Sequence, residues 1–438
     1  MTTTALEQQS YGASWLMVAA IILIGVGAVL KQPDVATVLI ILGLIAGAIA
    51  IVASRSATLR AFGRRAVTMV MVVGIVVQAI VFTVQSTLPL PLPLVGLGLA
   101  ALGVYAIVSD GRWRTMQMTV VVIGHFILMA GMLAISGPPD IDVYDFQQLA
   151  SEAMLNGENP FAIRFPNTAG LDSPYYSPEV VDGDQLTFGF IYLPLSLLLA
   201  LPGYALLGDY RYAALAALSL AALLIVFARP GRLAAGASLL VLFAPITQFV
   251  LYWGWSDTFA ALPFVAVALL ARRASAATPI GVGLLIALKQ YLPILLILAV
   301  FVLGRARERV GWPAFVGVSV LTATLTVVPF FVWDPGAFIY STVTMHVLQP
   351  FRDDSLSVPA LLVRAGFAQL PSAIGFVVAG LAVVLVAWRA PPTAASFCAG
   401  SAVVLTAFFL FSKQAFLNYY FLPLLALAVA LSMAEDDR

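Results

Sequence analysis

Long apolar runs, separated by short polar connections, constrain this chain more than any other feature of its sequence. The apolar core of a bilayer is about 30 Å thick, and a helix crosses it with about 20 residues at about 1.5 Å each. Lipid offers the backbone no hydrogen-bond partners, so the runs predict an all-α polytopic membrane protein with about 12–14 transmembrane helices. The runs lie near residues 13–30, 35–53, 66–84, 92–108, 117–135, 188–207, 212–228, 234–251, 257–271, 279–303, 311–333, 371–388, 395–412 and 419–432.

The composition supports this fold class and excludes others. The 438 residues are 62% hydrophobic and 10% charged, whereas soluble domains have about 45–50% and about 25%. These values exclude a soluble enzyme and a disordered protein. A formal net charge of +1 provides no basic field that would attract nucleic acid. Cys398 is the single cysteine, and with only His125 and His346 as histidines the chain offers no zinc site.

The positions of the arginines predict the orientation of the runs, because basic residues favour the cytoplasmic side of a membrane. Arg55 and Arg60 follow the second run, which places the amino terminus inside and the polar stretch 136–187 outside. That stretch holds nine acidic residues and a single base, Arg164. Residues 1–11 contain no basic residue, so we expect no cleaved signal peptide and a first span that is retained.

Two runs break the simple alternation of sides. The run at 188–207 contains Pro194 and Pro202. The arginines that follow stay on the cytoplasmic side if this segment does not cross fully, so we expect it to be kinked or re-entrant. The run at 279–303 has arginines beyond both ends, so we expect two half-length helices with a turn at 289–293. Lys289 then lies at the tip of a hairpin, on the outer side and at membrane depth.

Three acidic residues at the start of the outer loop form the first candidate site. Asp140, Asp142 and Asp145 lie within six residues of one another. A carboxylate at this position can act as a general base on a hydroxyl group or hold a divalent cation. The alternative interpretation is a solvated loop whose acids begin a helix.

Cations expected on the same side form a second group. A lysine inside an apolar run costs about 2.5–3.5 kcal/mol on insertion scales, which makes Lys289 a candidate phosphate ligand. The alternative is a lysine that extends to the membrane interface. Arg352, near His346 in the outer loop 334–357, can bind a phosphate or pair with the acids beside it. Lys413, at the outer end of the last hairpin, can bind a phosphate or belong to a helix start in an aromatic belt.

Aromatic and amide side chains complete the outer set. Trp255 can stack on a sugar ring while Asp257 binds a sugar hydroxyl, or the two can form a helix start in an aromatic belt. Asn418 and Tyr419, which follow Lys413, are equally open to both interpretations. His125 lies in the middle of a run, where an interhelical hydrogen bond is the expected role.

The order of these motifs resembles the GT-C superfamily of integral-membrane glycosyltransferases, and within it the polyprenyl-phosphate-mannose-dependent mannosyltransferases (glycosyltransferase family 87 and its uncharacterised relatives). The resemblance covers about 118–432. The four preceding spans look like an amino-terminal addition, which divides the chain into 1–116 and a catalytic domain at 117–438. The motifs are Asp142-Val143-Tyr144, Gly157-Glu158-Asn159-Pro160-Phe161, Tyr192-Leu193-Pro194, Gly208-Asp209-Tyr210-Arg211-Tyr212, Trp255-Ser256-Asp257, the lysine-tipped hairpin, Arg352-Asp353-Asp354-Ser355-Leu356 and Asn418-Tyr419-Tyr420.

The resemblance implies a GT-C-like bundle whose large first extracytoplasmic loop, 136–187, contains short amphipathic helices. It implies inverting transfer of a sugar, commonly mannose, from a polyprenyl-phosphate donor to a hydroxyl of a glycolipid, glycan or protein. The family's catalytic aspartate corresponds to Asp140, with Asp142 as the alternative. No cofactor is expected, although the acids leave a divalent metal open. The implied donor-phosphate ligands are Lys289, Arg352, Lys413 and His346. The implied sugar and acceptor ligands are Tyr144, Asn159, Trp255, Asp257, Gln290, Tyr291, Asn418 and Tyr419.

The same resemblance places the protein in the cell membrane, with its active site on the extracytoplasmic side. A transporter or flippase for a lipid-linked or small anionic solute is the alternative function. Such a protein needs ionisable residues along a path through the bilayer, and here His125 is the main mid-span candidate. A membrane scaffold is a third interpretation, in which the polar groups would lie far apart.

Overall fold

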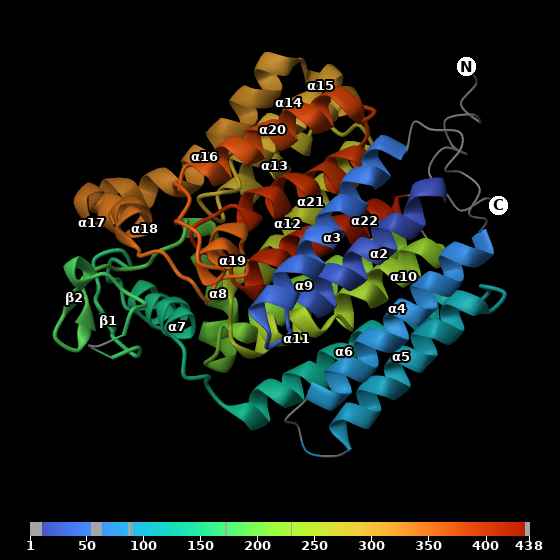
Figure 1. The fold of residues 1–438 in the computed structure, drawn as a ribbon, viewed down its shortest axis with the longest axis horizontal. Helices are drawn as coiled ribbons and strands as arrows, with labels where there is room; N and C mark the ends of the chain where they lie inside the picture. The colour runs from blue at the N-terminus through green and yellow to red at the C-terminus, as the bar shows by residue number, and fades with distance from the viewer. Residues whose placement is uncertain are drawn as a thin grey trace.

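A computed structural model describes residues 11–53, 64–85, 89, 91–170, 173–228 and 230–433, and within them the chain is a bundle of helices (Figure 1). The positions of Arg55, Arg60, Asp172 and Arg229 lie outside the described residues. The amino-terminal half contains α2 (Tyr11–Gly27), α3 (Pro33–Ala53), α4 (Arg64–Gln85), α5 (Leu92–Val108), α6 (Arg114–Ser136), α7 (Asp142–Leu155), α8 (Pro194–Leu207), α9 (Arg211–Ala228), α10 (Arg232–Leu242) and α11 (Pro245–Tyr252).

The second half continues in the same way. Its α-helices are α12 (Ala261–Arg272), α13 (Thr278–Ile286), α14 (Ile294–Val302), α15 (Gly304–Val310), α16 (Trp312–Trp333), α17 (Pro335–Ile339), α18 (Met345–Leu348), α19 (Val358–Arg364), α20 (Ile374–Arg389), α21 (Ala394–Leu410) and α22 (Phe421–Ser432). Short helical turns are η2 (Pro178–Val180), η3 (Ser256–Ala260), η4 (Tyr340–Thr344, a π-helix) and η5 (Leu417–Tyr420).

Several of these helices are suited to a membrane. Five described stretches are long and apolar enough to cross it, and a sixth is obtained if α10 and α11, bent by 47° at their junction, form one span. Other apolar helices are shorter, with 10–17 residues. The all-α polytopic fold class predicted from the sequence is therefore confirmed, but the described residues provide five or six stretches of spanning length instead of the predicted 12–14. The five stretches are Pro33–Ile51, Ala66–Val84, Arg114–Ser136, Arg211–Ala228 and Trp312–Trp333.

The run at 279–303 is interrupted as predicted, whereas the kinked or re-entrant course of 188–207 stays a prediction. The run at 279–303 forms α13 and α14, and the turn between them carries Lys289, whose carbonyl oxygen accepts from Leu292 N at 3.1 Å. Helix α8 begins at Pro194 and has 14 residues, about 21 Å at about 1.5 Å each. This length is shorter than the apolar thickness of a bilayer.

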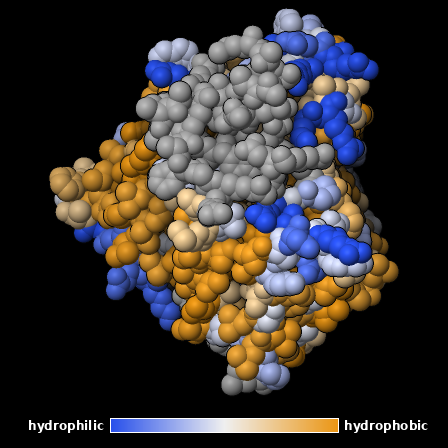
Figure 2. Space-filling view, turned by 90° about the vertical axis from the view of Figure 1, so that its right-hand side faces the viewer, coloured by the Kyte–Doolittle hydropathy of each residue, from blue (hydrophilic) through white to orange (hydrophobic). Residues whose placement is uncertain are grey.

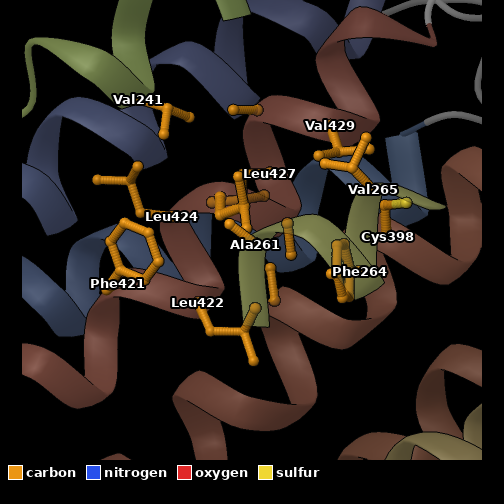
Figure 3. Packing of buried hydrophobic residues seen from close by; sticks show 14 of the residues in the cluster. Val241, Ala261, Phe264, Val265, Cys398, Phe421, Leu422, Leu424, Leu427 and Val429 are labelled. Atoms are coloured by element: carbon orange, nitrogen blue, oxygen red, sulfur yellow. The ribbon is translucent and has the colours of Figure 1, made fainter. Parts of the chain in front are cut away.

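The centre of the bundle is mainly apolar. Every residue of α22 from Phe421 to Ser432 is buried, as expected for a helix that is hydrophobic all round. Figure 3 shows Leu424 and Leu427 of this helix among side chains from other elements, such as Val241 and Phe264. The ring of Phe264 also stacks on Phe397 of α21, with centroids 5.8 Å apart.

The amino-terminal helices pack against the end of the chain. Helix α2 packs on α3, α4 and α22, and α3 packs on α21. Figure 1 shows this arrangement as blue ribbons beside red ones. The division at residue 116 remains a prediction, but α2 and α3 are in direct contact with the predicted catalytic part.

The acidic loop folds into a small unit with its own core. After α7, the strands β1 (Phe165–Pro166), β2 (Val181–Asp182) and β3 (Gln185–Leu186) form an antiparallel sheet in the order β1-β3-β2, which the sequence did not predict. Leu186 pairs with both Phe165 and Val181. The core of this unit contains Phe146, Phe161, Phe165, Phe188 and Phe190. It lies at one end of the bundle (Figure 1).

Figure 2 looks onto the opposite end, where both termini lie in Figure 1. Hydrophilic side chains form separate patches there, and hydrophobic side chains cover broad areas beside them. Helix α16 shows the same character, since Leu321, Leu325 and Val332 expose more than half of their surface. Exposed apolar surface of this extent suits contact with lipid.

Candidate functional site

A partly open cavity of about 640 Å³ lies beside the acidic-loop unit. Its walls come from segments far apart in the sequence: the α2–α3 connection, the start of α7, the sheet region, residues 191–192, Trp255 before η3, the loop after α18 and η5. Of the predicted site residues, the cavity wall includes Asp140, Asp142, Trp255, His346, Arg352, Asn418 and Tyr419. The structure thus brings together residues that span most of the chain.

Asp142 is the carboxylate of the acidic cluster that is held by a side-chain hydrogen bond. It begins α7 and is partly buried, and its Oδ2 accepts a hydrogen bond from the hydroxyl of Tyr176. Burial raises the pKa of Asp142 above the ordinary range of aspartate, while the Tyr176 hydrogen bond and the charge of Arg352 act in the opposite direction. Asp140, in contrast, is exposed at the cavity rim. The pKa of Asp145 is also raised, by burial and then by the charges of Asp142 and Asp140.

Arg352 is the main cation of the cavity wall on the side of this carboxylate. Its guanidinium lies 3.8 Å from the ring centroid of Tyr175 and 4.8 Å from that of Phe416. Its Nε and Nη2 donate to Asp354 at 2.8 and 2.5 Å. The predicted pairing with a neighbouring acid therefore exists, and the aromatic rings hold the guanidinium plane in one position.

A buried ion pair lies behind the cavity wall. Lys289 Nζ is 2.9 Å from Asp257 Oδ1. The carboxylate also accepts from Tyr291 Oη at 3.1 Å and from Asn418 Nδ2 at 2.9 Å. Four predicted site residues thus form one network, and the network satisfies the buried charge of Asp257. Lys289 also lies 4.7 Å from the ring centroid of Tyr192, a residue of the cavity wall.

His346 and Lys413 mainly bind backbone carbonyl groups. His346 Nε2 lies 3.0 Å from the carbonyl oxygen of Ile191, and Gln290 Nε2 donates to the same oxygen at 2.7 Å. Burial lowers the pKa of His346, which favours a neutral ring. Lys413 Nζ donates to the carbonyls of Val347 and Gln349 at 3.1 and 2.6 Å, and burial lowers its pKa. Lys413 and Gln290 do not line the cavity. Their hydrogen bonds to backbone carbonyls stabilise the segments that do.

Two further predicted ligands, Asn159 and Tyr144, also lie away from the cavity wall. Asn159 Oδ1 accepts from Phe161 N at 3.0 Å and stabilises the turn after α7. Tyr144 faces the guanidinium of Arg211, 5.0 Å from its ring centroid. Arg211 is itself 1% exposed and donates to the carbonyls of Gly137 and Tyr252 at 2.7 and 2.9 Å. This arginine joins the ends of α6 and α11 beneath the site.

Sequence reasoning missed three residues that line the cavity. Tyr176 binds Asp142, Tyr192 covers Lys289, and Lys31 comes from the α2–α3 connection. The sequence carried a signal for Lys31, because Lys31-Gln32 repeats the lysine–glutamine pair found at Lys289 and Lys413. The two tyrosines had no signal beyond their place in the acidic loop and beside Pro194.

The described residues contain no group of three histidine, cysteine or acidic side chains placed to hold a metal ion.

No model of a protein family matches the chain, and no curated protein matches its sequence. Among solved structures, the chain is similar to the crystal structure of ArnT from Cupriavidus metallidurans bound to undecaprenyl phosphate. The identity is 20% and the TM-score 0.49, over 74% of this chain and 60% of the ArnT chain. This chain thus spans less than two thirds of the length of that protein.

Proposed function

We propose that this protein is a GT-C-type membrane glycosyltransferase. It transfers a sugar, with mannose as the first candidate, from a polyprenyl-phosphate donor to a hydroxyl group of a glycolipid, glycan or protein. The observation that carries the proposal is that Asp142 and Arg352 line one cavity and contact adjacent residues of the chain, Tyr176 and Tyr175. A base in this cavity can take the proton of the acceptor hydroxyl group, and a cation can stabilise the leaving phosphate.

Asp142 is the proposed general base. In an inverting transfer, the acceptor oxygen forms a bond to the anomeric carbon while the bond from that carbon to the phosphate oxygen breaks. The acceptor proton passes to a carboxylate oxygen of Asp142. A raised pKa makes a carboxylate a stronger base at neutral pH, and Tyr176 holds this one in place. Asp140 is the second candidate because it lines the same cavity.

Arg352 is the proposed ligand of the leaving phosphate. Negative charge grows on that phosphate as the glycosidic bond breaks, and a fixed cation in a shielded site stabilises it. Tyr175 and Phe416 hold the guanidinium so that little reorganisation is needed. Lys289 takes a different role in this proposal, since its charge is balanced by Asp257 and it lies behind Tyr192.

The sugar is proposed to bind between Trp255 and the η5 turn. The ring of Trp255 offers a stacking surface, and Asn418 and Tyr419 line the same cavity with an amide and a hydroxyl group. We place this cavity on the extracytoplasmic side of the cell membrane, as the arginine distribution predicts. No resident metal or cofactor is part of the proposal.

The test uses the full chain in lipid nanodiscs with radiolabelled polyprenyl-phosphate-mannose and a lipid extract as the source of acceptors. We expect transfer by the wild type and a loss of about 10²- to 10⁴-fold in Asp142→Asn. Asp140→Asn serves as the matched variant and is expected to lose less. A thermal-unfolding midpoint equal to that of the wild type shows that each variant is folded.

Full transfer activity in both aspartate variants would show that neither Asp142 nor Asp140 is the general base. The transporter would be supported instead if the wild type consumed no lipid-linked sugar and showed counterflow of an anionic solute in proteoliposomes.

A further inference from the structure

The connection between α2 and α3 forms part of the cavity wall. Ala28, Leu30, Lys31 and Pro33 line the cavity together with residues of the acidic loop and η5. The helices that present this connection pack on α21 and α22 (Figure 1), so they are fixed to the rest of the bundle. The amino-terminal helices therefore contribute side chains to the candidate site.

Lys31 differs from the other cations near the site in its surroundings. It is exposed, and no described carboxylate forms an ion pair with it. Lys289 is paired with Asp257, and Arg352 with Asp354. Among the described residues, Lys31 is thus the cavity cation whose charge remains available to a ligand.

The charge of the cavity wall makes a further cation necessary for a phosphate ligand. The wall contains the carboxylates of Asp140, Asp142 and Asp354, and its described lysine and arginine residues are Lys31 and Arg352. Asp354 already binds Arg352 through two hydrogen bonds. A phosphate that bound Arg352 alone would face three carboxylates with one partly neutralised cation.

A single guanidinium links the position of Lys31 to that of Arg352. Arg364, at the end of α19, donates from Nε to Asp34 Oδ1 at 2.7 Å. Its Nη1 donates to the carbonyl oxygens of Asp353 and, at 3.2 Å, Ser355. Asp34 follows Lys31 by three residues, and Asp353 follows Arg352 directly. An exposed ion pair adds little stability, but this one connects the two segments that carry Lys31 and Arg352.

We propose that Lys31 is a phosphate-binding residue of the cavity, positioned relative to Arg352 by the Asp34–Arg364 pair. The ligand is the phosphate of a polyprenyl lipid, so this inference rests on the proposed function. Lys31 and Arg352 bind the phosphate from two sides, and the α2–α3 connection thus supplies one of the phosphate ligands.

The test measures the dissociation constant of undecaprenyl phosphate for the full chain in nanodiscs, with uncharged undecaprenol as the reference lipid. We expect Lys31→Gln to weaken binding of the phosphate about tenfold and to leave undecaprenol unchanged. Lys31→Arg is expected to restore most of the affinity. Gln32→Ala, at the exposed neighbour outside the cavity wall, is the matched control and is expected to bind as the wild type does.

A double-mutant cycle tests the positioning role of Asp34. We expect Asp34→Asn to weaken phosphate binding in the wild-type background and to have no further effect beside Lys31→Gln. Equal effects in both backgrounds would overturn the positioning role.

The remaining outcomes separate this inference from the proposed function. If the wild type prefers undecaprenyl phosphate to undecaprenol and Lys31→Gln keeps that preference, the role of Lys31 is wrong and the function stands. If Lys31→Gln weakens both lipids equally, the residue acts on the fold and the inference is also wrong. If the wild type shows no preference, the donor class is wrong and both proposals fall.

Discussion

Lys289 Nζ and Asp257 Oδ1 lie 2.9 Å apart, with 8% and 1% of the two side chains exposed. The pair joins the turn between α13 and α14 to η3, and it contacts Tyr192 and Asn418 of the cavity wall. A lysine at membrane depth is costly when unpaired. The carboxylate therefore explains why a lysine is tolerated at the tip of this hairpin.

Removing one member of the pair is expected to destabilise the fold. Asp257→Ala leaves a buried ammonium group without its partner, and we expect a loss of about 3–5 kcal/mol, measured as a lower midpoint of thermal unfolding in detergent. The double variant Asp257→Leu, Lys289→Met replaces both charges by apolar groups and should recover most of the loss. A midpoint unchanged in the single variant would show that the pair is not needed for stability.

The hydrogen bond from Tyr176 is expected to set the pH dependence of transfer. A general base must be deprotonated, so kcat/KM falls as the pH decreases through the pKa of Asp142. The hydrogen bond lowers that pKa, and Tyr176→Phe removes it. The acidic limb of the pH profile should therefore move to higher pH.

Tyr175→Phe provides the control for this measurement, because it keeps the ring against Arg352 and does not touch Asp142. Its profile should match that of the wild type. A shift of the Tyr176→Phe profile to lower pH would contradict the assignment of Asp142 as the base.

Arg352 is expected to act mainly through the donor. Arg352→Ala should raise KM for the polyprenyl-phosphate donor about 10- to 100-fold, since hydrogen bonds to charged groups are worth about 1.5–3 kcal/mol. Arg352→Lys should recover only part, because an ammonium group lacks the flat face that lies against Tyr175. Arg164→Ala removes an exposed pair with Asp182 and should change neither constant. A donor KM equal to the wild-type value in Arg352→Ala would exclude the phosphate role.

Chelation of divalent metals is expected to leave transfer intact. In the proposed mechanism the protein's own cations meet the charge of the leaving phosphate, so EDTA should not reduce the initial rate. The measurement compares transfer with EDTA, and with EDTA plus excess Mg²⁺ or Mn²⁺. A rate that is lost with EDTA and regained with one metal would assign the acidic cluster to metal binding.

The sequence predicted the elements of this fold better than their contacts. Basic residues beyond both ends of the run at 279–303 required an even number of crossings, and the structure places a turn at Lys289. The small sheet was missed because strands such as Phe165–Pro166 have two residues, too few for an alternating pattern to show. Its register depends on loop packing, which one sequence does not display.

The candidate site was predicted in part for the same reason. The arginine distribution places Asp142, Arg352 and Asn418 on one side, and all three line the cavity. The partners of these residues could not be read, because Asp257 and Asn418 are separated by 161 positions and meet through tertiary packing. Tyr144 and Asn159 belong to persuasive local motifs, yet their side chains serve Arg211 and a turn.

The burial of α22 on all sides also determines when the molecule can be completed. Helices α2 and α10 both pack on α22, although α2 ends at Gly27 and α10 at Leu242 while α22 begins at Phe421. At about 5–20 residues per second, ribosomes need about 20–80 s to extend the chain from α2 to α22. During that interval the surfaces that will hold α22 must be covered by lipid, by other helices or by an insertion factor. The membrane thus receives the other described helices first, and α22 fills the space between them last.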